Sequence, residues 1–219
     1  MLGCKARFCH NHKRREREIH NARGVKKIGT FRLKTPLKEE EIRKLRVKDI
    51  VFLSGTVFTA RDEAHERALK LFAEEKKLPF KTKDLALYHC GPVVQQKGEG
   101  WKIIAAGPTT SARMNLLEPI FVEKTGVRMI IGKGGMDENT AKALKTYGSV
   151  YLAFTGGAAL IAAKAIIKVN SVEWVDLGTP EAIWMLEVRD FGPLIVAIDS
   201  TGNNLYQEIY ENALKKKNS

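Results

Sequence analysis

Cysteine is scarce in this sequence, with three residues, Cys4, Cys9 and Cys90, in a chain of 219. So few thiol groups exclude a disulfide scaffold and are typical of a reducing compartment, so we expect the protein to be cytoplasmic. No signal peptide is expected, because the basic N-terminus is not followed by an apolar run. Cys90 follows an apolar run and precedes Gly91, and we expect it to be a buried, unreactive thiol.

Long hydrophobic runs are also missing, with one exception. The 18 residues between Lys145 and Lys164 carry no charge, a length that approaches a membrane span. Gly156 and Gly157 interrupt this stretch at its middle, and polar side chains are scattered through it. The pattern therefore favours a strand, a turn and a helix, and we expect no association with a membrane.

The common phosphate-binding motifs of nucleotide sites are absent. Five residues separate Gly126 from Gly132 and Lys133 where a P-loop has four, and Gly134 stands where that motif needs a hydroxyl group for magnesium. No Gly-x-Gly-x-x-Gly run follows a predicted strand either. These absences argue against a nucleotide site.

Positive charge is concentrated at one end of the chain. The formal net charge is +12, of which residues 1–27 supply +7, from nine Lys or Arg residues and two Glu. We expect residues 1–27 to be a flexible, solvated basic tail and residues 28–219 to form the folded domain. Nucleic acid or an acidic partner remain alternatives for the tail. Aromatic residues are not interleaved with its basic residues as a stacking surface requires, which makes nucleic acid the weaker alternative.

Potential metal ligands crowd the same tail, namely Cys4, Cys9, His10 and His12, with His20 further on. Their spacing matches no closed zinc finger, and no second Cys/His pair follows about a dozen residues later. We therefore expect no structural metal and no metal ligand in this chain.

Strands and helices are predicted to alternate through most of the chain. Apolar runs predict strands at 26–37, 49–53, 56–59, 85–90, 102–106, 127–131, 150–154, 173–177 and 193–198. Helical spacing predicts helices at 38–45, 61–77, 113–121, 140–147, 158–168 and 203–217, with a polar hairpin loop at 95–100. This alternation predicts an α/β fold with a largely parallel or mixed sheet and flanking helices.

Cations recur where predicted strands give way to helices. Thr109 and Arg113 follow the strand at 102–106, Lys133 lies in a glycine-rich turn after the next strand, and Arg61 opens a helix. The carboxyl ends of parallel strands meet at one edge of a sheet, where ligands gather. A cation at a helix start is disfavoured by the helix dipole unless an anion is present. The pattern therefore predicts one shared site for a small polyanion.

Each of these residues also has a simpler interpretation. Arg61 and Arg113 could be solvated surface residues, or they could pair with Asp62 and Glu118. The hydroxyl residues before Arg113 could be ordinary helix caps. The residue pattern alone leaves these alternatives open.

Three motifs in order give the sequence a family resemblance. They are Ser54-Gly55-x5-Arg61-Asp62-x-Ala64-His65, Gly107-Pro108-Thr109-Thr110-Ser111-x-Arg113-Met114 and Gly132-Lys133-Gly134-Gly135. Together they resemble the beta subunit, or C-terminal domain, of class I fumarases and L-tartrate dehydratases. The resemblance covers residues 27–208, and the basic tail falls outside it.

The resemblance implies a swivelling β/β/α domain from an iron–sulfur hydro-lyase that interconverts (S)-malate and fumarate, with L-tartrate dehydration as the near alternative. It implies that Arg61, Arg113 and Lys133 bind the dicarboxylate. It also implies that Thr109, four residues before Arg113, carries the hydroxyl group of the catalytic base. A stand-alone α/β protein that binds anions or nucleic acid is the alternative from another class.

The resemblance also implies a [4Fe–4S] cluster. Such a cluster needs about three or four cysteine thiolates, and two of the three cysteines here lie in the tail. We therefore expect the cluster on a separate alpha subunit, with the active site between the two chains. This chain is then expected to be inactive without its partner.

Overall fold

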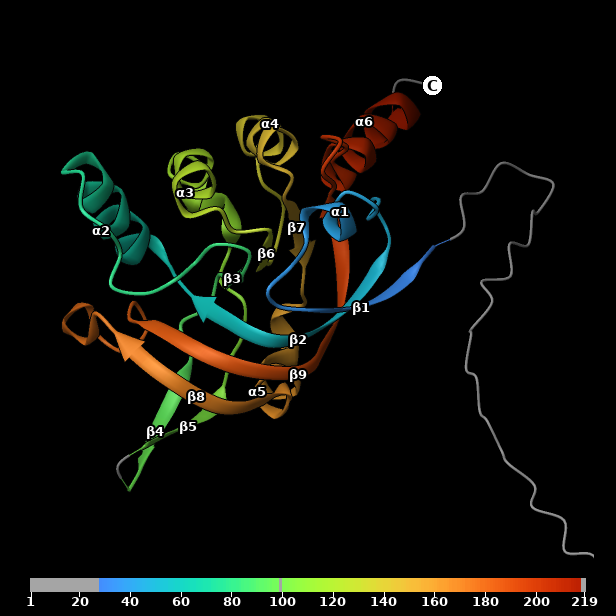
Figure 1. Cartoon of the computed structure of the whole chain (residues 1–219). Coiled ribbons are helices and arrows are strands. Elements are labelled where there is room, and N and C mark those ends of the chain that lie inside the picture. Colours follow the sequence, from blue (N-terminus) through green and yellow to red (C-terminus); the bar gives the residue numbers. More distant parts are fainter. Residues whose placement is uncertain (1–27, 99, 218–219) are drawn as a thin grey trace, which may run out of the picture.

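The computed structural model describes residues 28–98 and 100–217, and the predictions for residues 1–27 lie outside this part of the chain. Strands and helices alternate along it (Figure 1). The strands are β1 (Thr30–Lys34), β2 (Ile50–Thr59), β3 (Ala86–Tyr88), β4 (Val93–Lys97), β5 (Gly100–Ala105), β6 (Met129–Gly132), β7 (Val150–Ala153), β8 (Ile166–Glu173) and β9 (Ile183–Ile198). The α-helices are α1 (Glu39–Ile42), α2 (Asp62–Ala73), α3 (Glu118–Thr125), α4 (Glu138–Tyr147), α5 (Ala159–Ala165) and α6 (Leu205–Lys217). Short 3-10 turns lie at Ser111–Met114, Gly156–Ala158 and Val175–Leu177.

The main sheet is mixed and closes on itself. Strands β1, β2, β3, β6 and β7 lie side by side in that order, each parallel to its neighbour. The long strand β9 runs antiparallel to β7, to β2 and to β8. Because β9 pairs with both β7 and β2, the strands β2, β3, β6, β7 and β9 form a ring, beside which β4 and β5 make a separate hairpin. The predicted α/β fold with a mixed sheet and flanking helices is confirmed.

Side chains of the parallel strands alternate between two apolar layers, as the two-residue period of a strand requires. In β3, Ala86 and Tyr88 pack in the layer shared with β9 and α5, whereas Leu87 packs in the layer shared with α2, α3 and α4. Fully burying a side chain such as Leu87 contributes roughly 1.5–3 kcal/mol. Both faces of the sheet are therefore covered, which explains why its strands read as nearly continuous apolar runs.

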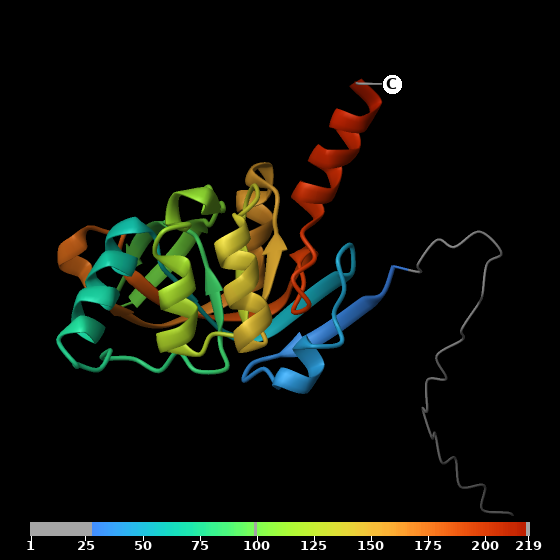
Figure 2. The ribbon, with the colours of Figure 1, turned by 90° about the horizontal axis from the view of Figure 1, so that it is seen from above.

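Helices α2, α3 and α4 lie next to one another along one face of the sheet (Figure 2). Local signals fix their ends. The Asp137 carboxylate accepts a hydrogen bond from the Thr140 backbone nitrogen (2.9 Å) at the start of α4. Gly126 and Gly148, both with a φ of +67°, end α3 and α4 in the left-handed conformation that glycine adopts without strain. Helix α6 projects away from the body of the molecule (Figure 2).

Two strands predicted at 49–53 and 56–59 are in fact one, because β2 continues through Gly55. Gly55 has a φ of +96°, and the pairing of β2 with β9 shifts beside it. The turn residue is therefore accommodated as a β-bulge and not as a break.

Predictions around the last strands were wrong in several boundaries. The helix predicted to reach residue 168 ends at Ala165, because the β-branched residues that follow pair with β9 as β8. The strand predicted at 173–177 gives way to a 3-10 turn after Glu173, and the strand at 193–198 is only the last part of β9. Gln95 and Gln96 belong to β4 and not to a loop.

The uncharged stretch between Lys145 and Lys164 forms the end of α4, β7, a 3-10 turn and most of α5, so the predicted strand, turn and helix are confirmed. None of the described helices is long and apolar enough to cross a bilayer.

Candidate active site at the carboxyl ends of the parallel strands

The segments that follow the parallel strands, where the anion site was predicted, lie at one edge of the sheet. Thr59 at the end of β2 pairs with Tyr88 of β3, and Gly132 at the end of β6 pairs with Ala153 of β7. The carboxyl ends of the parallel strands are therefore level. Residues that follow them directly share this edge, where α/β proteins commonly bind ligands.

Thr109 and Lys133 are held together by their backbones. The Thr109 nitrogen donates a hydrogen bond to the carbonyl oxygen of His89 (2.6 Å), just after β3. The Lys133 nitrogen donates to the Thr109 carbonyl oxygen (3.3 Å), and the Ser111 nitrogen donates to the Lys133 carbonyl oxygen (3.1 Å). The loop that carries Thr109 thus lies between the ends of β3 and β6, and it places Thr109 beside Lys133.

The side chains of Thr109 and Lys133 are half-buried, and neither makes a hydrogen bond or ion pair with another described residue. The Lys133 stem lies against Gly156, where a Cβ atom would be 3.6 Å from its Cδ and 3.8 Å from its Nζ. A hydroxyl group and an ammonium group are therefore left available at this edge.

Arg61 immediately precedes α2, and it is paired. Its Nε lies 3.2 Å from Oε1 of Glu181, while Oε2 of Glu181 accepts a hydrogen bond from the Glu63 nitrogen (3.1 Å) at the start of the helix. Burial raises the pKa of the Glu181 carboxyl group, and Arg61 opposes this shift. On its other side, the guanidinium group lies so close to Gly91 that a Cβ atom there would be 2.7 Å from Nη1.

Arg113 lies on a 3-10 turn and binds Asp62 through two contacts. Its Nε donates to Oδ1 of Asp62 at 2.9 Å, and its Nη2 contacts Oδ2. Burial works to raise the pKa of Asp62, but the hydrogen bond from Arg113 and the nearby charges hold it below its usual value. The ion pairs left open from the sequence, Arg61 with Asp62 and Arg113 with Glu118, do not form, because Asp62 binds Arg113 and Arg61 binds Glu181.

Beneath the Thr109 loop lies a set of buried groups that the sequence analysis missed. His65 from α2, His89 after β3 and Glu118 at the start of α3 form what we call the buried triad. Oε2 of Glu118 lies 3.4 Å from Nε2 of His65 and 3.0 Å from Nε2 of His89, and all three side chains are 0% exposed.

The buried triad is connected to the loops above it. Nδ1 of His89 lies 2.9 Å from Oγ of Ser111, and the Tyr151 hydroxyl group lies 3.0 Å from the same oxygen. That hydroxyl group is also 2.9 Å from the carbonyl oxygen of Gly134, next to Lys133. A Cβ atom at Gly132 would lie 1.9 Å from Oγ of Ser111, so only glycine fits there. The network therefore fixes both the Thr109 loop and the Lys133 turn.

Electrostatics within the buried triad follow from burial and contact. Burial works to raise the pKa of Glu118, but the opposing effect of His89 and His65 is larger and brings the pKa down to about 2. Burial lowers the pKa of His65, yet Glu118 raises it to a net value above the usual range. For His89 burial dominates, so its pKa lies below the usual range. Glu118 is therefore a buried carboxylate that requires a neighbouring positive charge.

Comparison with known proteins identifies the family. Residues 5–209 match the family described as the fumarase C-terminus, so the expectation that residues 1–27 fall outside the resemblance was wrong. The chain belongs to this family.

Several relatives are similar to the fumarase C-terminus chain described here. A Methanocaldococcus jannaschii protein assigned as L(+)-tartrate dehydratase subunit beta is 44% identical over 183 residues, which cover 83% of this chain and 94% of the relative. L(+)-tartrate dehydratase subunit beta of Escherichia coli K12 is 40% identical over 176 residues, covering 80% and 86%. A Geobacillus stearothermophilus protein assigned as class I fumarate hydratase is 40% identical over 185 residues, covering 84% of this chain and 35% of that longer protein. The relatives are named as dehydratases and a hydratase. The family resemblance inferred from the three motifs is confirmed.

The described part of this family member does not fit an iron–sulfur cluster. Cys90 is the one cysteine in residues 28–98 and 100–217, and it is fully buried. Burial raises the pKa of its thiol to about 12, so it stays protonated, whereas a cluster needs thiolates. The expected buried, unreactive thiol is confirmed. The tail residues that could ligate a metal lie outside the described residues.

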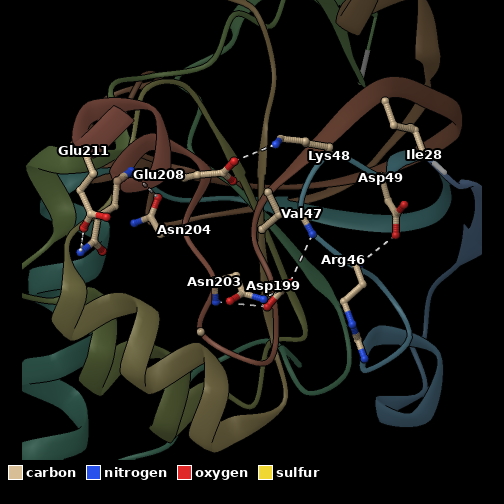
Figure 3. A pocket seen from close by; sticks show the side chains of 12 residues that line it. Ile28, Arg46, Val47, Lys48, Asp49, Asp199, Asn203, Asn204, Glu208 and Glu211 are labelled. Carbon is tan, nitrogen blue, oxygen red and sulfur yellow. Dashed lines mark hydrogen bonds and ion pairs between the residues drawn. The ribbon is translucent and has the colours of Figure 1, made fainter. Parts of the chain in front are cut away.

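A pocket of about 470 Å³ lies at the opposite end of β2, between α6 and the segment before β2 (Figure 3). Its charged side chains have hydrogen-bond or ion-pair partners in the chain, although only Lys48 and Glu208 pair with each other. Asp199 accepts hydrogen bonds from Thr201 and Asn203, and Lys48 forms an ion pair with Glu208 (3.0 Å). None of the residues predicted for the anion site lines this pocket.

Proposed function

We propose that this chain is the beta subunit of a two-subunit hydro-lyase that reversibly removes water from a hydroxy diacid. One observation carries the proposal: the backbones of Thr109 and Lys133 are hydrogen-bonded to each other, and their side chains, which have no partner among the described residues, lie at the edge of the sheet that also carries Arg61 and Arg113. The names of the relatives support the same reaction class.

In the proposed reaction the cations stabilise negative charge. Removal of a proton from the carbon beside a carboxylate turns that carboxylate into an enediolate, which carries additional negative charge. Arg61, Arg113 and Lys133 bind the two carboxylates and stabilise this charge as it develops. Because Asp62 and Glu181 hold the two guanidinium groups in place, these groups need little reorganisation when the substrate arrives.

Thr109 is the proposed proton acceptor. A threonine hydroxyl group is a weak base unless nearby positive charge lowers its pKa. Lys133 is joined to Thr109 by a backbone hydrogen bond and supplies such a charge. The hydroxyl group makes no hydrogen bond with another described residue, so no protein partner competes with a substrate for it.

We place the iron–sulfur cluster on an alpha subunit. A [4Fe–4S] cluster, when bound, supplies a Lewis acid for the departing hydroxyl group. Cys90 is a buried protonated thiol and does not suit such a cluster. The term subunit beta in the names of the relatives supports a two-subunit enzyme. In this proposal the alpha subunit faces the carboxyl edge of the sheet.

Two diacids are candidate substrates. The resemblance predicted (S)-malate, with fumarate as the product, and the Geobacillus stearothermophilus relative supports this choice. The relatives named for L(+)-tartrate dehydratase support L-tartrate. The two acids differ by one hydroxyl group, so a single set of cations could bind the carboxylates of either.

The experiment is reconstitution of the pair. The full chain is co-expressed with candidate cluster-bearing alpha subunits and purified anaerobically, and dehydration of (S)-malate and of L-tartrate is measured on the same preparation. We expect a stable complex that dehydrates one acid with at least a tenfold higher kcat/KM than the other, since one hydroxyl group at a site built to bind it gives discrimination of about that size or more. Each subunit alone serves as the control and is expected to be inactive. Turnover by this chain alone, or a stable complex that dehydrates neither acid, would contradict the proposal.

A further inference from the structure

The buried triad brings three potential metal ligands to one point. Nε2 of His65, Nε2 of His89 and a carboxylate oxygen of Glu118 all lie within 4.8 Å of one another. They come from α2, from the end of β3 and from the start of α3, so any ion bound here would connect three elements of the fold.

The hydrogen-bond pattern of the triad is incomplete. Nε2 of His65, Nε2 of His89 and both carboxylate oxygens of Glu118 are buried without a hydrogen-bond partner. Oε2 of Glu118 lies 3.0 Å from Nε2 of His89 and 3.4 Å from Nε2 of His65. The ring nitrogens are nevertheless not aligned for hydrogen bonds to the carboxylate. Buried polar atoms that lack partners are rare, and here three of them, the two Nε2 atoms and Oε2 of Glu118, lie close together.

The outer ring nitrogens are already occupied. Nδ1 of His65 lies 2.7 Å from the carbonyl oxygen of Arg61, which can only accept, so Nδ1 carries the proton. In the neutral ring, Nε2 then directs its lone pair towards the Glu118 carboxylate. Nδ1 of His89 has Ser111 as its outer partner at 2.9 Å. Metal-binding histidines typically have such an oxygen partner on the second nitrogen, which fixes the ring and its tautomer.

We propose that His65, His89 and Glu118 bind one divalent metal ion, zinc by the type of ligand. Two imidazole nitrogens with one carboxylate is a ligand set that zinc uses, and the ion would satisfy the buried atoms that now lack partners. Three protein ligands leave the fourth tetrahedral position of the ion to a water molecule, and all three side chains are 0% exposed. Its role would be to fix the base on which the Thr109 loop rests. This inference does not depend on the proposed function.

The test is metal analysis of the full-length protein, purified without a metal-affinity tag and dialysed against a weak chelator. We expect about one zinc ion per chain by elemental mass spectrometry. A His89→Asn variant is expected to retain less than a tenth of that amount. Tyr151→Phe is the matched control, because it removes a buried hydroxyl group next to the triad without removing a ligand, and it is expected to retain the zinc.

The cysteines of the tail are a rival source of zinc, so a Cys4→Ser, Cys9→Ser double variant is analysed beside the others and is expected to keep its zinc. Because His89→Asn could fail to fold, wild-type protein stripped of metal is also titrated with zinc. We expect saturation at one equivalent together with a rise in Tm. Loss of zinc from the double variant but not from His89→Asn would overturn the proposal. Absence of binding by stripped wild-type protein would also overturn it, and a proton on His65 would then balance Glu118.

Discussion

The two ends of β2 carry polar groups in contrasting states. At the amino end, beside α6, Asp199 is surrounded by hydrogen-bond donors and Lys48 is paired with Glu208 (Figure 3). At the carboxyl end, the side chains of Thr109 and Lys133 have no partner among the described residues. The amino end has the pocket of about 470 Å³, but its charged side chains already have hydrogen-bond or ion-pair partners in the chain. Unpaired groups, more than volume, therefore distinguish the candidate site.

Removal of the Thr109 hydroxyl group should have the largest effect. In the reconstituted pair, Thr109→Val is expected to lower kcat by about 10³-fold or more, because it removes the proposed proton acceptor, while KM changes little. Steady-state assays with the preferred diacid measure both constants. Thr110→Val, at the exposed neighbouring residue, is the control and should behave like wild type. Equal losses in the two variants would remove the special role of Thr109.

Removal of the Lys133 charge should follow in size. Lys133→Met is expected to lower kcat/KM by about 10²-fold, because a pre-placed cation no longer stabilises the enediolate. Lys44→Met, which removes an exposed lysine far from this edge, is the control. Both are measured in the same assay. Unchanged kcat/KM in Lys133→Met would mean that the ammonium group faces away from the substrate.

Weakening the ion pair that holds the Arg113 guanidinium group should lower kcat/KM by less than loss of the Lys133 charge. Asp62→Asn keeps the Arg113 charge but weakens its paired contact, and we expect a loss of roughly tenfold in kcat/KM. Asp176→Asn is the matched control, because it weakens the exposed pair with Arg67. A rise in activity of Asp62→Asn would indicate that Asp62 competes with the substrate for Arg113.

Changes at the amino end of β2 should matter least. Lys48→Gln combined with Glu208→Gln removes an ion pair whose side chains are each 50% exposed. Such pairs contribute about 0–1 kcal/mol to the free energy of unfolding. We expect denaturant unfolding to show a loss within that range and kcat/KM to stay within about twofold of wild type. A large loss of activity would show that the comparison assigns the site to the wrong end of the strand.

Much of the fold was predictable because the signals are local. Apolar runs and glycine-rich turns identified the parallel strands, and the cations beside them indicated a shared edge. The length of β9 was not predictable, because its pairing with β2, β7 and β8 is set by residues far apart in the chain. The α5 boundary failed for a similar reason, since pairing with β9 overrides the helical pattern after Ala165.

The candidate site was predictable only in part. The sequence offered Asp62 and Glu118 as partners of the neighbouring arginines, but Asp62 binds Arg113 instead of Arg61. The pairing of Arg61 with Glu181 spans most of the domain and leaves no local signal. From the sequence, Glu118 was expected only as a possible ion-pair partner of a nearby arginine. Only the fold shows that it is buried with His65 and His89, which lie on other elements.

The central claim is that Arg61, Arg113, Lys133 and Thr109 contact one diacid. The most direct measurement is a crystal structure of the reconstituted complex with the preferred diacid bound. We expect the three cations to contact the carboxylates and the Thr109 hydroxyl group to face the carbon that loses its proton. A diacid bound at another surface, with these four side chains out of contact, would contradict it.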